Sequence, residues 1–178
     1  MFEDKWLIWK LRQGSSDALC HIYEKYKKNM LALAHALLND KTLAEDIVHD
    51  CFVSFAGRGK TLELKTCLKS YLLVSVANRI KNLSRDNLKS DVDIDEIEIA
   101  DLNSAIPLSN AINIELAGKI DSAMQQLPYD QREIISLHLQ HGLKFREIAS
   151  LQNVSINTIQ SRYRYGIDKL RTLLDEKV

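Results

Sequence analysis

The sequence predicts an all-α protein with two small helical domains joined by an acidic linker, the C-terminal one a four-helix domain containing a helix-turn-helix. Three observations predict this fold. The 178 residues include only two prolines and six glycines, the residues least suited to helix interiors. Apolar residues recur at steps of three and four in both ends of the chain, which is the spacing of amphipathic helices. Acidic residues are concentrated between those two ends.

The formal net charge of zero conceals an uneven distribution of charge. Residues 1–85 carry fourteen Lys and Arg against nine Asp and Glu, whereas residues 86–118 carry one lysine against eight acids. Residues 119–178 are basic again, with nine Lys and Arg against seven Asp and Glu. Two basic segments separated by an acidic one favour a nucleic-acid partner. We therefore expect domains over 1–85 and 112–178, with the linker over 86–111.

The linker contains the run DVDIDEIEIAD, in which valine and isoleucine alternate with acids. Strict alternation is typical of a strand, but a helical chain offers no second strand to pair with it. Its high charge favours a disordered, solvated tether in the free protein. The alternative is that the isoleucines dock between the two domains and hold them together.

Four helices are expected in the first domain. The break at Gly14-Ser15-Ser16 supplies a hydroxyl that can cap the second helix, and Thr42 with Glu45 forms a capping box for the third. The basic segment from Gly57 to Lys60 is expected to be a flexible loop. It lacks the spacing of a phosphate-binding loop, which argues against nucleotide hydrolysis. The expected helices cover residues 2–13, 17–38, 43–55 and 64–84.

The last of these helices changes from apolar to polar at its C-terminal end. The polar residues there are Asn78, Arg79, Lys81, Asn82 and Arg85. Cations at this end are stabilised by the negative end of the helix dipole, which explains the arginines and the lysine. The dipole does not explain two asparagines, which are poor helix formers. Contacts to DNA bases or phosphates are the second interpretation of this cluster.

In the C-terminal domain, a helix over 112–126 ends before Pro128, which is placed to start the next helix, and Gly142 ends that one. Residues 144–174 then form two helices joined by a short turn, with Ser155 as the cap of the second. Apolar residues occupy one face of the second helix and hydrogen-bonding residues the other. The polar set is Asn157, Thr158, Gln160, Ser161, Arg162, Arg164 and Tyr165.

This pattern has two interpretations, a DNA-binding helix-turn-helix or a helical hairpin that only packs a core. The polar face contains two arginines and no acid between Asn157 and Tyr165, whereas an ordinary solvated face mixes both signs. Arginine and the amides of asparagine and glutamine suit base edges and phosphates. The composition of this face therefore favours DNA.

Other kinds of function find little support in the sequence. Cys20, Cys51 and Cys67 are odd in number and widely spaced, which predicts buried, reduced thiols and neither a disulfide framework nor a metal site. No run of about 18 apolar residues predicts a membrane span, and the N-terminus lacks the features of a signal peptide. We expect a cytoplasmic protein without a cofactor or metal, and not an enzyme.

Several short motifs occur in an order and at a spacing that resemble the extracytoplasmic-function sigma factors of bacterial RNA polymerase, from about Leu11 to Leu174. Each motif alone is weak, but the series together is specific. The motifs are Ala44 to Phe52 (AEDIVHDCF), Ala77-Asn78-Arg79 with Arg85, Leu127-Pro128, Arg132-Glu133, Ile148-Ala149, and Thr158 to Arg162 (TIQSR). The resemblance implies core RNA polymerase and promoter DNA as partners, with an anti-sigma factor as a further candidate.

The resemblance also implies roles for individual residues. It implies that Asp46, Ile47, Val48, His49, Asp50 and Phe52 contact the polymerase clamp. Recognition and melting of the minus-ten element fall to Arg58 and Lys60 in the loop and to Asn78, Arg79, Asn82 and Arg85 on the helix. Reading of the minus-thirty-five element falls to Lys144, Arg146, Asn157, Thr158, Gln160, Ser161, Arg162, Arg164 and Tyr165.

The sequence departs from the family pattern at positions that bear on DNA. Lys144 replaces the usual Ser or Thr cap, so either the first helix of the motif starts less firmly or the lysine reaches a phosphate. Gln160 and Tyr165 replace cations, and Arg164 replaces an aromatic residue, which predicts an altered minus-thirty-five preference. The alternative function is a stand-alone helix-turn-helix regulator that binds palindromic sites as a dimer.

Overall fold

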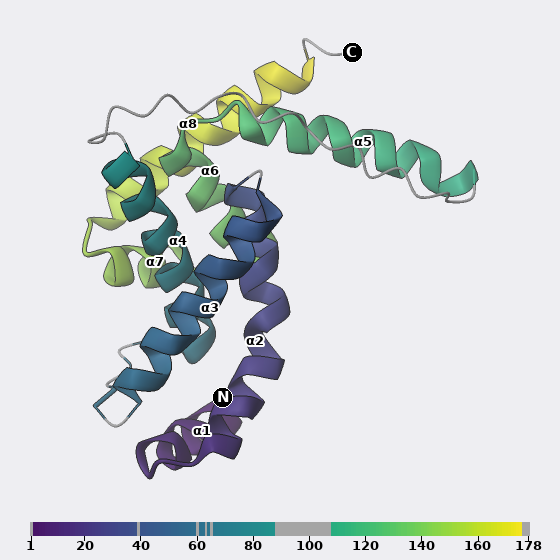
Figure 1. The fold of residues 1–178 in the computed structure, drawn as a ribbon. Helices are drawn as coiled ribbons and strands as arrows, with labels where there is room; N and C mark the ends of the chain where they lie inside the picture. Colours follow the sequence, from purple (N-terminus) through teal and green to yellow (C-terminus); the bar gives the residue numbers. More distant parts are fainter. Residues whose placement is uncertain are drawn as a thin grey trace.

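The computed structural model describes residues 2–38, 40–59, 61, 62, 64, 66–87 and 108–175, and within these ranges it is helical without a strand, as predicted (Figure 1). The acidic linker lies largely outside the described residues, and Lys60 lies outside them too. The elements are α1 (Phe2–Arg12), α2 (Ser16–Leu37), α3 (Lys41–Arg58), α4 (Leu68–Asn87), α5 (Leu108–Gln125), α6 (Tyr129–Ile135), the π-helical segment η1 (Ser136–Gln140), α7 (Phe145–Gln152) and α8 (Ile156–Asp175).

Side-chain caps fix where the early helices begin. The Ser15 hydroxyl accepts from the Ala18 amide at 3.3 Å, so the predicted cap of the second helix is confirmed. The capping box predicted for the third helix is wrong, because the helix begins two residues earlier. The Asp40 carboxylate accepts from the Leu43 amide at 3.0 Å and takes the place of the Thr42 hydroxyl as the cap.

In the N-terminal half, helices α1, α3 and α4 all pack against α2. Ile22, Met30 and Leu33 of α2 are completely buried in this core. The short α1 is tied to α2 by Lys25, whose ammonium lies 2.7 Å from Glu3 and 2.8 Å from Asp4. Helix α2 is therefore the axis of the N-terminal half, and the other three helices are placed relative to it.

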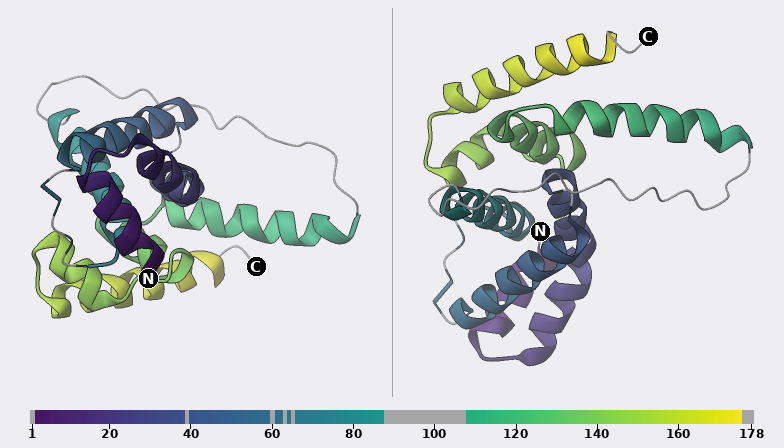
Figure 2. Two further views of the ribbon diagram at one scale, coloured as in Figure 1. Left: turned by 90° about the horizontal axis from the view of Figure 1, so that it is seen from below. Right: turned by 45° about the horizontal axis from the view of Figure 1, so that its top comes forward.

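The C-terminal half is built from α5 to α8. Helix α6 continues into η1, which ends at Gln140, and the chain then turns at Gly142, whose φ of +73° suits glycine. The N-terminal end of helix α5 extends away from the rest of the molecule, and the helix then passes beside α8 towards α6 (Figures 1 and 2). The four-helix arrangement predicted for this half is confirmed, with the π-helical segment as an addition that hydrophobic periodicity does not reveal.

The two halves are packed against each other along α4, which lies between the N-terminal helices and α7 (Figure 2). Ile134, Leu137 and Ile148 of the C-terminal half are fully buried and belong to the same core as the N-terminal helices. The sequence predicts two domains on a tether, and it gives no sign of this shared core. The broad apolar face of α4 supplies the physical reason, because it is covered from both halves.

The thiols are not all buried, which corrects the sequence-based expectation. Cys51 is buried, and burial raises the pKa of its thiol to about 11, but Cys20 is exposed. All three cysteines are free. In the described ranges no helix is long and apolar enough to cross a membrane, and no cluster of His, Cys, Asp and Glu could hold a metal ion.

Gly166 sets how closely α8 approaches α6. A Cβ at this position would lie 2.8 Å from Ile135 Cδ1 and 3.1 Å from Gln131 Cβ. We expect Gly166→Leu to lower the free energy of unfolding by about 1 to 3 kcal/mol, because the larger side chain overpacks this contact. Gly118→Leu on α5 is the control, because its Cβ would meet nothing within 4 Å and leucine is the better helix former. Urea denaturation followed by circular dichroism measures both, and equal stability of the two variants would contradict the prediction.

Candidate nucleic-acid interface

The helix-turn-helix is fixed by two local hydrogen bonds and one left-handed residue. The Glu147 carboxylate accepts from the Lys144 amide at 2.9 Å, so α7 starts firmly without a Ser or Thr cap. Asn153 ends α7 in the left-handed conformation with φ of 54°, which asparagine tolerates better than most residues. The Ser155 hydroxyl then accepts from the Thr158 amide at 3.0 Å, which confirms it as the cap of α8.

Helix α8 presents two rows of polar side chains. Asn157, Gln160 and Arg164 are exposed and lie three and four residues apart, so they share one face with the half-buried Ser161. The neighbouring row contains Thr158, Arg162 and Tyr165, of which only Tyr165 is exposed. Ile159, on the opposite side, is completely buried and fixes the rotation of the helix.

Two residues of the second row already have partners within the protein. The Thr158 hydroxyl lies 2.8 Å from the Ser155 hydroxyl. The Arg162 guanidinium lies 2.8 Å from the carboxylate of Asp130, at the start of α6. Of the predicted DNA-contacting residues of α8, the first row and Tyr165 are therefore open to a ligand in this conformation, together with exposed Lys144 and Arg146 at the start of α7.

Aromatic packing holds α8 against α7 and η1. The ring centroids of His138 and Phe145 lie 4.1 Å apart, and Tyr163 packs 5.1 Å from Phe145 and 5.2 Å from His138. The His138 imidazole also makes a 2.7 Å hydrogen bond to the Leu143 carbonyl. This cluster joins the three elements of the motif. Tyr163 belongs to the apolar face predicted for the second helix, whereas His138 and Phe145 were not singled out from the sequence.

The predicted minus-ten residues on α4 are all exposed. Asn78, Asn82 and Arg85 are spaced four and three residues apart and share a face, while Arg79 is turned toward α3. The Arg79 guanidinium lies 2.9 Å from the Asp50 carboxylate, so a residue assigned to DNA is paired with one assigned to the polymerase.

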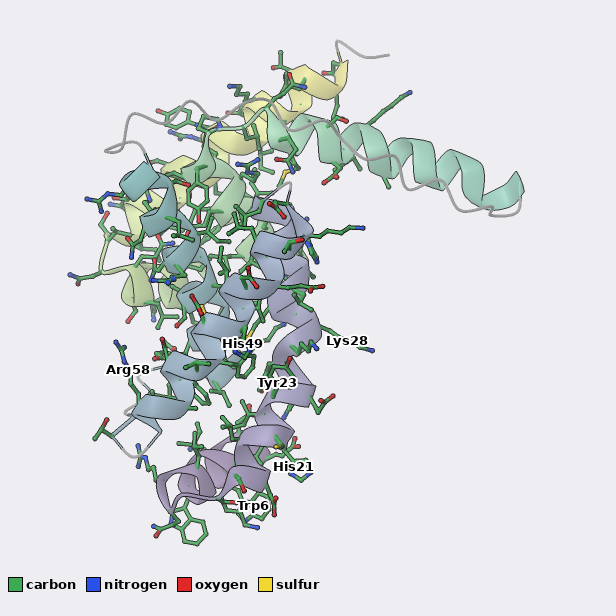
Figure 3. The ribbon with its side chains drawn as sticks, in the orientation of Figure 1. Trp6, His21, Tyr23, Lys28, His49 and Arg58 are labelled. Carbon is green, nitrogen blue, oxygen red and sulfur yellow. The ribbon has the colours of Figure 1, made fainter. Side chains whose placement is uncertain are left out.

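Arg58 belongs to a helix and not to a loop. Helix α3 runs through Gly57 and ends at Arg58, whose side chain is exposed at the far end of the helix from its start (Figure 3). The flexible loop predicted from Gly57 to Lys60 is therefore wrong for Gly57 and Arg58, which continue the helix.

The predicted polymerase-contacting residues divide into two sets. Asp46, His49 and Asp50 are exposed on α3 (Figure 3). Ile47 and Val48 are only 2% exposed and Phe52 6%, so these three pack in the core of this structure, as helical spacing allows, and their assignment to the polymerase stays a prediction. The family motif mixes both kinds of residue because successive positions of one helix point in different directions.

Two apolar side chains extend the exposed face of α3. Leu43 is 38% exposed and Val53 is 58% exposed, and Val53 follows Asp46 by seven residues, which places it on the same face. Sequence reasoning missed both residues. Helical spacing from Asp46 is the signal that could have identified Val53.

Glu133 of α6 is the most unusual charged group near the motif. Its side chain is completely buried, Gln152 donates to one carboxylate oxygen, and the other oxygen has no hydrogen-bond partner. Burial raises the pKa of Glu133 to about 7, with a smaller contribution from Asp130, although Lys81 and Arg162 lower it. Near neutral pH this carboxyl is therefore partly protonated inside the C-terminal half.

The raised pKa of Glu133 predicts a pH-dependent contribution to stability. Because the folded-state pKa of about 7 exceeds the ordinary 4.5, this contribution is fully present below pH 4.5 and is lost as pH rises through 7. Glu133→Gln should therefore gain stability relative to the wild type by about 2 to 4 kcal/mol between pH 5 and 8.5, at about 1.4 kcal/mol per pKa unit. Urea unfolding across this range measures the difference, and a difference independent of pH would contradict the assignment.

The sequence is similar to known proteins over most of its length. The family model for sigma-70, region 4, matches residues 117–170. The chain is 26% identical to the RNA polymerase sigma factor CarQ of Myxococcus xanthus over 167 residues, which cover 94% of this chain and 95% of that protein. It is 25% identical to the RNA polymerase sigma-H factor of Pseudomonas aeruginosa, with coverage of 98% and 97%.

Two solved structures have a similar fold. CnrH in complex with the cytosolic domain of CnrY matches with a TM-score of 0.74 at 20% identity, over 99% of both chains. The sigma factor RpoE in complex with the anti-sigma factor NepR from Bartonella quintana matches with a TM-score of 0.65 at 23% identity, over 83% of this chain and 91% of that one. The similarity in fold therefore extends to both halves.

Proposed function

We infer that this chain, an extracytoplasmic-function sigma factor of RNA polymerase, starts transcription at specific promoters by recruiting core polymerase, reading two promoter elements and opening DNA. The observation that supports these roles is that one chain has an exposed polar face on α4 and another on α8. Neither face contains an acid among its candidate DNA-contacting residues. Phosphates and base edges are the ligands that such faces suit.

The C-terminal helix-turn-helix, over 112–178, is proposed to read the minus-thirty-five element. Asn157, Gln160 and Arg164 face outward in one row, as side chains that enter a major groove must. Lys144 and Arg146 lie at the N-terminal end of α7, where an exposed cation can reach a phosphate. Arg162 is assigned a supporting role, since Asp130 already binds it.

The N-terminal half, over 1–85, is proposed to dock on the polymerase and to open the minus-ten element. The docking surface is the exposed face of α3, which contains Asp46, His49 and Asp50 with Val53 beside them. Asn78, Asn82 and Arg85 on α4 are proposed to hold bases of the opened strand. Arg58 is proposed to contact the phosphate backbone of the DNA. Capturing a base outside the stack needs contacts that offset a few kcal/mol of unstacking.

This activity needs no chemistry by the protein itself. Sigma factors are regulatory DNA-binding proteins, and we propose that this one acts in the cytoplasm without a cofactor. An anti-sigma factor is a further candidate partner, because the sigma factor RpoE, which has a similar fold, was solved in complex with the anti-sigma factor NepR.

The polymerase-docking assignment is tested by run-off transcription with purified bacterial core polymerase on genomic fragments of the source organism. We expect new start sites that share two spaced elements, and a loss of about tenfold or more in the double variant Asp46→Ala, His49→Ala. Asp50 is left intact because it pairs with Arg79. Glu24→Ala, an exposed acid on α2, is the matched control and should retain activity. Absence of new starts, with palindromic sites bound by the protein alone, would support the stand-alone regulator and refute the sigma-factor role.

The reading helix is tested by substituting one exposed amide. Gln160→Ala should relax base preference at one minus-thirty-five position by a factor of about 5 to 150, because a bidentate contact discriminates by about 1 to 3 kcal/mol. Transcription from a promoter library randomised over that element measures the preference. Lys169→Ala, exposed further along α8, is the control and should leave the base preference unchanged. An unchanged preference in Gln160→Ala would remove this residue from the reading set.

A further inference from the structure

A cavity of about 500 Å³ lies where α1, the segment that leads into α4, and α7 come together. Ile8 lines it from α1, Cys67 from the start of α4, and Ser150 from α7. Binding sites for small molecules have volumes of about 300 to 1,000 Å³. The cavity is therefore large enough for a small organic ligand.

Most of the cavity wall is apolar. Ile8 and Leu64 are half-buried in it, and Leu68, the first residue of α4, is 1% exposed. The Cys67 thiol beside Leu68 adds another weakly polar surface. Burying an apolar group against such a wall removes the surfaces of both from water, which favours a ligand with an apolar body.

The two acids of the lining are already bound by donors of the protein. The Asp4 carboxylate accepts from the Lys25 ammonium and from the Tyr26 hydroxyl, each at 2.8 Å. The Glu147 carboxylate accepts from the Lys144 amide at 2.9 Å. These contacts stabilise both carboxylates without a ligand, so the acids give the cavity no need of a cation.

The two cations of the lining differ from the acids in this respect. Lys5 and Arg146 are exposed, and neither has a hydrogen bond or an ion pair with another of the described residues. A guanidinium can donate two parallel hydrogen bonds to one carboxylate, and an ammonium adds a further charge-assisted donor. Lys5 and Arg146 are therefore available to bind the anionic group of a ligand.

Two helices begin at the cavity, and their N-terminal ends also favour an anion. Helix α4 begins at Leu68 without an acid in its first turn, and α7 begins at Phe145, where Glu147 offsets part of the effect. The N-terminal end of a helix carries a partial positive charge. The buried Thr66 hydroxyl in the same wall has no hydrogen-bond partner among the described residues, which leaves one more donor unused.

We propose that this cavity binds a small organic anion with an apolar body. The anionic group binds Lys5 and Arg146, and the apolar body lies against the wall formed by Ile8, Leu64 and Leu68. Binding at this cavity does not depend on the proposed function. Arg146 is also a proposed phosphate contact, so the anion and DNA would compete for this one cation.

Cys67 reports occupancy of the cavity in the full-length protein. Its thiol lies 2.9 Å from the Ser70 hydroxyl in the lining, whereas Cys20 is exposed outside the cavity and Cys51 is buried. Iodoacetamide alkylates accessible thiols, and mass spectrometry of the digest gives the rate at each cysteine. The probe is decanoate, a linear carboxylate. Decanol and decylammonium carry the same chain with a neutral and a cationic head, and they are the matched controls.

Saturating decanoate should slow the alkylation of Cys67 about tenfold, because a ligand at ten times its dissociation constant leaves about a tenth of the sites open. The rate at Cys20 should not change. Decanol should protect Cys67 less than decanoate, and decylammonium least. Equal protection by all three probes would refute an anion site. A Cys67 that decanoate does not protect, or that does not react in the free protein, would refute the cavity as a binding site.

The role of the two cations is tested by the double variant Lys5→Gln, Arg146→Gln. Decanoate should then bind about tenfold more weakly or worse, because both charge-assisted contacts are lost. The concentration that half-protects Cys67 measures this affinity. Lys28→Gln with Arg171→Gln removes two exposed cations outside the lining and should leave the affinity unchanged. Circular dichroism checks that the helices remain, and a folded Lys5 and Arg146 variant with wild-type affinity would overturn the proposal.

Discussion

The burial of α4 is the constraint on which the rest of the structure depends. Leu68, Leu72, Leu73, Val76 and Ile80 are each at most 1% exposed. With Ser70, Val74 and Ala77 also buried, the buried face takes in about two thirds of the circumference, at 3.6 residues a turn. A helix that is apolar over so wide an arc needs packing from more than one side. Helices α2 and α3 cover one side and α7 lies against another, so the two halves meet on α4.

The polar residues of the interface follow from this packing. Where α4 lies against the C-terminal half, two of its lysines contact acceptors there: Lys69 donates to the His141 carbonyl and Lys81 pairs with Asp130. His141 is buried beside Lys69, and burial together with that cation lowers the pKa of its imidazole to about 4. Burial likewise raises the pKa of Glu133. The titratable groups of this region are therefore perturbed by the contact between the halves as well as by their own helices.

The same packing leaves separate surfaces for function. The exposed stripe of α4 with Asn78, Asn82 and Arg85 is what remains after the apolar arc is covered, and the row of Asn157, Gln160 and Arg164 is what remains of α8. On α3, Asp46 and His49 face outward because Ile47 and Val48 fill the core. Each candidate contact face is thus the complement of a buried face, and its position on the molecule is fixed by packing.

The sequence by itself determined the helical class, the helix-turn-helix, the Ser155 cap and the polar faces of α4 and α8, because helix period and capping act within a few residues. Only the tertiary structure decided that Ile47, Val48 and Phe52 are all buried together, and where α3 ends. It also decided that Asp130 binds both Lys81 and Arg162, which are separated from it by 49 and 32 positions in the chain. Helical periodicity reports neighbours three and four residues apart, whereas these contacts depend on how the wide apolar face of α4 is covered.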